Sequence, residues 1–102
     1  MARFYRITKN DPPTVEDFMS RAALGDPRPQ ALSQRRWEGV SMWTDLERVR
    51  RMALRTPRLG KFLAVVDLPD SVEREQEGPP GHFEVYGRAV DLHACVVETQ
   101  PV

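Results

Sequence analysis

The stretch WEGVSMWTDLERVRRMA, residues 37–53, contains both tryptophans of the chain and joins a strand pattern to a helix pattern. Within VSMW the side chains alternate, so that Val40 and Met42 share one face of a short strand. Ser41 and Trp43 share the other face. After Trp43 the spacing of apolar residues changes to the helical period, and the stretch therefore predicts a strand that runs into an amphipathic helix.

The predicted helix spans about residues 45–55, and a T-x-x-E capping box formed by Thr44 and Glu47 marks its beginning. One side of this helix is apolar and contains Leu46, Val49, Met52 and Ala53. The opposite side contains Arg48, Arg51 and Arg55. We expect this arginine side to face solvent, with some of its charges paired to acidic residues of the same helix. The alternative is that it binds phosphate or nucleic acid.

The remaining segments extend the pattern in both directions along the chain. Strands are predicted at RFYRIT (3–8), at Phe62–Val66 within KFLAVVDLP, at HFEVYG and at LHACVVETQ, and a helix is predicted from Val15 to Ala23 behind a capping box of Thr14 and Asp17. A polar loop with two prolines covers residues 25–36. The order β-α-β-α-β-β-β predicts one α+β domain over residues 1–102, with a mixed or antiparallel sheet and two flanking helices.

Composition limits the classes of function and the compartment. The formal net charge is 0, so no overall field attracts nucleic acid, and we do not expect a nucleic-acid partner. Cys95 is the single cysteine, which excludes an internal disulfide, and no segment approaches the ~20 apolar residues of a membrane helix. We expect a cytoplasmic protein without a membrane contact. His82 and His93 are eleven positions apart with no thiolates nearby, and we expect no metal site.

Two strand residues are candidates for chemistry. Glu84 shares a face with His82 and Tyr86, opposite Phe83 and Val85. If that face is solvent, all three are surface residues; if it lines a cleft, the carboxylate can act in acid–base chemistry or stabilise a cation. Ser41 either bonds its own backbone or, beside the indole of Trp43, holds a flat polar ring.

Together, Arg6 in FYRIT, Ser41 in WEGVSMWTDLERVRRMA and Glu84 in HFEVYG resemble the three-part pattern of the ADP-ribosyltransferase-like fold. The resemblance implies that NAD binds in a cleft between two halves of the sheet. Arg6 would hold a phosphate or ribose of NAD, Ser41 would support the nicotinamide pocket, and Trp43 would stack there. Glu84 would stabilise the cationic ribose formed as nicotinamide leaves. His82 stands where arginine-modifying members of this fold have Gln or Glu.

The resemblance leaves three outcomes open: a transferase, an NAD glycohydrolase, and a catalytically degenerate fold that only binds NAD. A different class of function is a non-catalytic interaction module of a larger assembly, or of a toxin- or phage-related system. Such a module would use the 25–36 loop and the arginine face as contact surfaces. A homodimer with one tryptophan in the contact is a further possibility.

Overall fold

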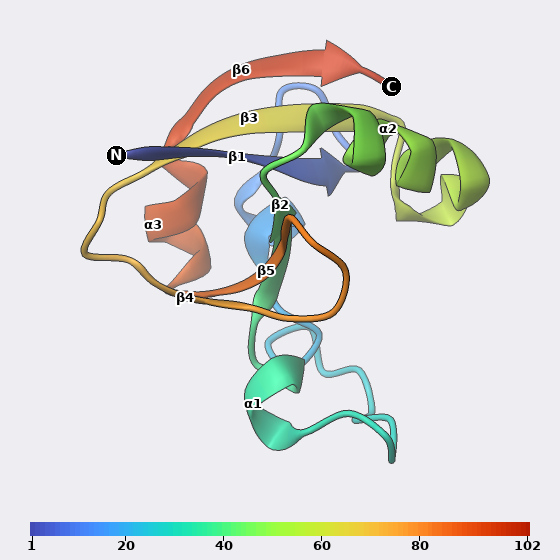
Figure 1. Cartoon of the computed structure of the whole chain (residues 1–102), viewed down its shortest axis with the longest axis vertical. Coiled ribbons are helices and arrows are strands. Elements are labelled where there is room, and N and C mark those ends of the chain that lie inside the picture. The colour runs from blue at the N-terminus through green and yellow to red at the C-terminus, as the bar shows by residue number, and fades with distance from the viewer.

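Six strands form one sheet in the computed structural model, which describes residues 1–102 (Figure 1). They are β1 (Ala2–Thr8), β2 (Val40–Trp43), β3 (Phe62–Leu68), β4 (Glu73–Gln76), β5 (His82–Tyr86) and β6 (Val96–Pro101). Their order across the sheet is β4-β5-β2-β1-β3-β6, and every neighbouring pair is antiparallel. The α+β class expected from the sequence is confirmed, and the sheet is antiparallel rather than mixed.

Three short α-helices accompany the sheet. They are α1 (Gln34–Trp37), α2 (Leu46–Arg55) and α3 (Ala89–His93), with 3-10 turns η1 (Val15–Phe18) and η2 (Pro57–Leu59). None of these helices has the length and apolar character needed to cross a membrane.

The sheet is split between its two central strands. β1 pairs with β3 over seven residues, and β2 pairs with β5 over four, but β1 and β2 pair only at Tyr5 and Trp43. In Figure 1, β1, β3 and β6 cross the top of the view together, whereas β2 and β5 run downward from them. Beyond the Tyr5–Trp43 pair, β1 and β2 are therefore no longer paired with each other.

Apolar side chains pack on both faces of the sheet. One core cluster joins the sheet to η1 and α3 and contains Phe4, Phe18, Val40, Met42, Ala64, Val66, Leu68, Val85 and Leu92. The second joins it to α2 through Trp43, Val49 and Leu63. Val40 and Met42 thus lie opposite Trp43, as the alternation in VSMW predicts, and β3 is buried from Leu63 to Val66.

The predicted helix from Val15 to Ala23 is wrong beyond its first turn. The capping interaction exists, since the Asp17 carboxylate accepts from the Thr14 backbone N–H at 2.9 Å. Only η1 forms, however, because the Asp17 carbonyl accepts from the Arg6 side chain instead of from a backbone N–H one turn later. A long-range hydrogen bond thus takes the acceptor that a continuing helix requires.

Four further local features differ from the predictions. The N-cap of α2 is Asp45, which accepts from the Arg48 N–H at 3.2 Å, whereas Thr44 bonds the Gly81 carbonyl. The segment before HFEVYG, for which no strand was predicted, contains β4, which pairs with β5. The last predicted strand begins later, at Val96, because α3 covers Ala89–His93. The 25–36 loop ends in α1, which was not predicted.

Candidate functional site

Arg6 bridges the two halves of the split sheet. Its Nε donates to the carbonyl of Asp17 in η1, and its Nη1 donates to the carbonyl of Ser41 in β2, each at 2.7 Å. Burial lowers the pKa of Arg6 to about 10, while the carboxylates of Asp17 and Glu84 oppose that change. The guanidinium therefore stays charged at neutral pH, and two of its three nitrogens already bind backbone carbonyls.

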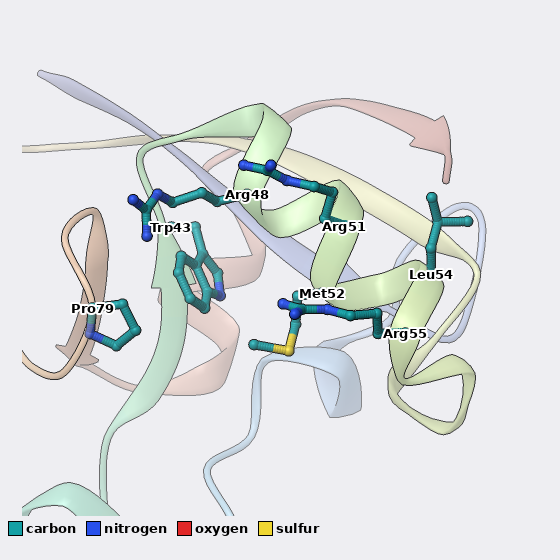
Figure 2. A pocket seen from close by; sticks show the side chains of 7 residues that line it. All are labelled: Trp43, Arg48, Arg51, Met52, Leu54, Arg55 and Pro79. Atoms are coloured by element: carbon teal, nitrogen blue, oxygen red, sulfur yellow. The ribbon is translucent and has the colours of Figure 1, made fainter.

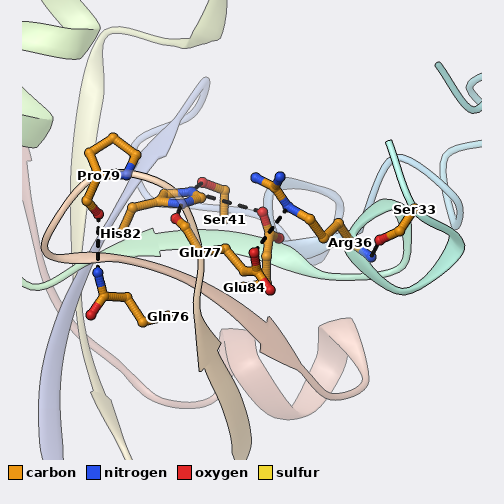
Figure 3. Close-up of polar contacts among 8 residues, drawn as sticks. All are labelled: Ser33, Arg36, Ser41, Gln76, Glu77, Pro79, His82 and Glu84. Atoms are coloured by element: carbon orange, nitrogen blue, oxygen red, sulfur yellow. Dashed lines mark hydrogen bonds and ion pairs between the residues drawn. The ribbon is translucent and has the colours of Figure 1, made fainter. Parts of the chain in front are cut away.

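Ser41 and His82 face each other across the β2–β5 pair. The Ser41 hydroxyl lies 2.6 Å from His82 Nε2, and His82 Nδ1 lies 2.5 Å from the carbonyl of Glu77 (Figure 3). A carbonyl can only accept, so Nδ1 carries a proton, and in the neutral form of the ring Nε2 accepts a hydrogen bond from the Ser41 hydroxyl. The Trp43 and His82 rings pack at a centroid distance of 4.7 Å. This arrangement fixes the orientation of the imidazole on three sides.

Glu84 is a buried carboxylate rather than a surface residue. It is 7% exposed, pairs with Ser41 in the strand register, and has Oε1 3.9 Å from His82 Nε2. Burial raises the pKa of Glu84, and the nearby His82, Arg36 and Arg6 oppose this rise. The interpretation of this β5 face as a solvated surface is therefore wrong at Glu84 and at His82, which is 9% exposed.

Gly39 leaves room for this carboxylate. A Cβ at position 39 would lie 2.7 Å from Glu84 Oε2 and 2.9 Å from Glu84 Cβ. Both distances are shorter than any ordinary contact, so a larger residue would displace the Glu84 side chain. The glycine two positions before Ser41 thus has a steric reason in this structure.

Two polar atoms beside Glu84 lack a hydrogen-bond partner although they are buried. They are Arg36 Nε, which lies 3.7 Å from Glu77 Oε2, and the hydroxyl of Tyr86. The Arg35 guanidinium stacks on the Tyr86 ring at 3.6 Å and holds that side chain in place. The surroundings of Glu84 therefore contain hydrogen-bonding capacity that the protein itself does not use.

Two adjoining cavities open at the split. The first, of about 230 Å³, is lined by Arg6, Ile7, Ser41, Trp43, Met52, Leu59 and His82. The second, of about 350 Å³, includes Arg6, Gly39, Ser41, Arg36 and Glu84 in its lining. The predicted residues Arg6, Ser41 and Glu84 thus meet at one cavity, whereas Trp43 lines the neighbouring one with Arg6 and Ser41.

Sequence reasoning did not select His82, Gly39 or Arg36 as site residues. The alternation in HFEVYG placed His82 beside Glu84, so a signal for it existed. Arg36 comes from α1 and has no comparable signal. No group of three or more His, Cys, Asp or Glu side chains is placed to hold a metal ion.

Comparison of the chain with protein-family models, with curated proteins and with solved structures found no match.

Proposed function

We propose that the protein binds NAD at the split in the sheet and cleaves the bond between nicotinamide and ribose, either by transfer of ADP-ribose or by hydrolysis. The observation that carries this proposal is the meeting of Arg6, Ser41 and Glu84 at one cavity, although they are far apart in the sequence. This is the spatial arrangement that the resemblance to ADP-ribosyltransferase-like proteins requires.

The cavity beside Ser41 and Trp43 suits nicotinamide. When the His82 ring is neutral, the Ser41 hydroxyl donates a hydrogen bond to Nε2, and its lone pairs can then accept from the carboxamide N–H of nicotinamide. Trp43 and Met52 form an apolar wall of this cavity. A flat ring with one polar edge would thus meet an apolar wall at its face and a hydroxyl at its edge.

Arg6 and Glu84 supply opposite charges to the two parts of the substrate. The Nη2 of Arg6 makes no hydrogen bond within the protein and is left to contact a phosphate or ribose oxygen. Positive charge develops on the ribose as neutral nicotinamide leaves with the bonding electron pair. A carboxylate held at that position, away from water, stabilises the charge strongly.

The raised pKa of Glu84 has a consequence for this chemistry. Only the ionised carboxylate stabilises a cation, so cleavage should increase as the pH rises through the pKa of Glu84. The unpaired thiol of Cys95 accords with a reducing compartment, and we place the activity in the cytoplasm.

The test combines a thermal shift with millimolar NAD and an assay of nicotinamide release. Glu84→Gln should keep the NAD-induced shift and lose about 100- to 1000-fold in release. Glu98→Gln, on the exposed edge strand β6, is the matched control and should release nicotinamide like the wild type.

Each other outcome has a defined meaning. A shift without release indicates a degenerate fold that only binds NAD. Absence of both shift and release contradicts the proposal and favours the non-catalytic interaction module. Equal loss of release in both variants would show that Glu84 has no special role.

A further inference from the structure

A third hollow, separate from the two cavities at the split, is bordered by arginines. It has a volume of about 440 Å³ and is lined by Trp43, Arg48, Arg51, Met52, Leu54, Arg55 and Pro79. We call it the arginine hollow. Figure 2 shows Arg48 and Arg55 extending toward Trp43 from the two ends of α2, with Arg51 between them along the helix.

The guanidinium groups of the arginine hollow are weakly paired. Arg51 and Arg55 form no salt bridge, and Arg48 has only Asp45, at a long 3.7 Å, with the two side chains 43% and 48% exposed. Between residues 45 and 61 the sequence has six basic and two acidic residues, although the whole chain is neutral. The positive charge is therefore local to this face and available to an anionic ligand.

The floor of the arginine hollow is apolar, which the sequence pattern of α2 does not reveal. The Trp43 indole, which comes from β2 and is 7% exposed, lies there with Pro79, which comes from the turn before β5. Cationic side chains beside an aromatic and apolar surface are the combination that binds single-stranded nucleic acids, because they contact the phosphates and the bases together.

We infer that the arginine hollow binds a single-stranded nucleic acid. Trp43 and Met52 line this hollow and also the cavity of Ser41 and His82, so a strand held by Arg48, Arg51 and Arg55 lies at the mouth of that cavity. The inference goes beyond the proposed function and does not require it, since binding is measured without NAD.

The test uses fluorescence anisotropy with a labelled single-stranded oligonucleotide of mixed sequence. Three phosphate contacts predict a slope of about −2 for log K against log salt, which is roughly a 20-fold loss of affinity between about 50 and about 200 mM salt. The double variant Arg51→Ala/Arg55→Ala should bind more weakly and reduce the slope to about −0.7.

A second double variant, Arg28→Ala/Arg88→Ala, is the matched control. It removes the same charge from exposed positions outside the hollow and should keep the slope of about −2. Because the wild-type chain has no net charge, equal losses in both double variants would show a dependence on total charge and would overturn the inference.

A spectroscopic readout locates the strand. Trp37→Phe leaves Trp43 as the only tryptophan, and its fluorescence should change when the oligonucleotide binds. An unchanged signal at saturation would place the strand elsewhere and overturn the inference. The anisotropy measurements do not depend on this variant.

One result would assign these arginines to NAD instead of to a nucleic acid. If no oligonucleotide binds at about 50 mM salt, while Arg51→Ala/Arg55→Ala weakens the NAD-induced thermal shift, the arginines serve the phosphates of NAD. The inference then fails, and the proposed function stands.

Discussion

Replacement of Gly39 by alanine tests the packing around Glu84 directly. The new Cβ would lie 2.7 Å from Glu84 Oε2 and 2.9 Å from Glu84 Cβ, against the 3.4 Å at which ordinary contact begins. The carboxylate could turn away, but the Cβ of Glu84 is fixed to strand β5 and cannot. Gly39 has no positive φ, so backbone strain does not contribute and the effect is steric.

Overpacking of this kind costs about 1–3 kcal/mol of the free energy of unfolding. For a domain of this size the melting temperature falls by about 4–8 °C per kcal/mol. Gly87→Ala is the control, because its new Cβ would lie 3.3 Å from Leu92 Cδ2, a much milder approach than the 2.7 and 2.9 Å at Gly39. We expect a clearly smaller change for Gly87→Ala in the same calorimetric measurement.

A second readout separates general destabilisation from displacement of the carboxylate. If Gly39→Ala pushes Glu84 toward solvent, the pKa of Glu84 should fall toward its ordinary value, because burial is the main cause of its rise. An NMR titration of the Glu84 carboxyl carbon measures this. A variant that melts like the wild type and keeps the raised pKa would refute the packing described around Gly39.

Two further predictions concern the other charged groups of the site. Arg6→Met removes both donors and leaves the carbonyls of Asp17 and Ser41 without their partner, so urea denaturation should show a loss of about 1–3 kcal/mol for each; Arg28→Met, at an exposed position, should show a clearly smaller loss. Because the pKa of Glu84 is raised on folding, its burial costs stability above that pKa, and the cost disappears as the pH falls toward the ordinary glutamate value. Glu84→Gln should therefore be more stable than the wild type at neutral pH, and denaturation curves at decreasing pH should converge; a constant difference would contradict this.

Strand and face assignments followed from the sequence wherever one face of an element is buried. The alternation in VSMW separates Val40 and Met42 from Trp43, and the apolar run from Phe62 marks a strand covered on both sides. Strand β4, with the sequence EREQ, has no apolar face and exists because β5 offers it a free edge. Such an edge strand has no signal of its own in the sequence.

The site was predictable only in part, for a related reason. The pattern selected Arg6, Ser41 and Glu84, but whether Glu84 faces solvent depends on α1 and the 25–36 loop, whose sequence does not determine where they pack. The short turn η1 is a second case in which long-range packing, not the local sequence, decides the structure. Its periodicity favours a longer helix, yet a side chain that is distant in sequence takes the Asp17 carbonyl.

The site and the irregularity of the sheet have one origin. In a continuous sheet, backbone groups of β1 would pair with the Ser41 carbonyl; here the Arg6 guanidinium takes that role and also binds Asp17. A side chain spans more distance than a backbone hydrogen bond, so the strands separate while their polar groups stay paired. Both cavities lie at this separation and share Arg6 and Ser41. A substitution that closed the ladder would therefore remove the space for a ligand, and the interruption in the sheet is what makes room for binding in so small a domain.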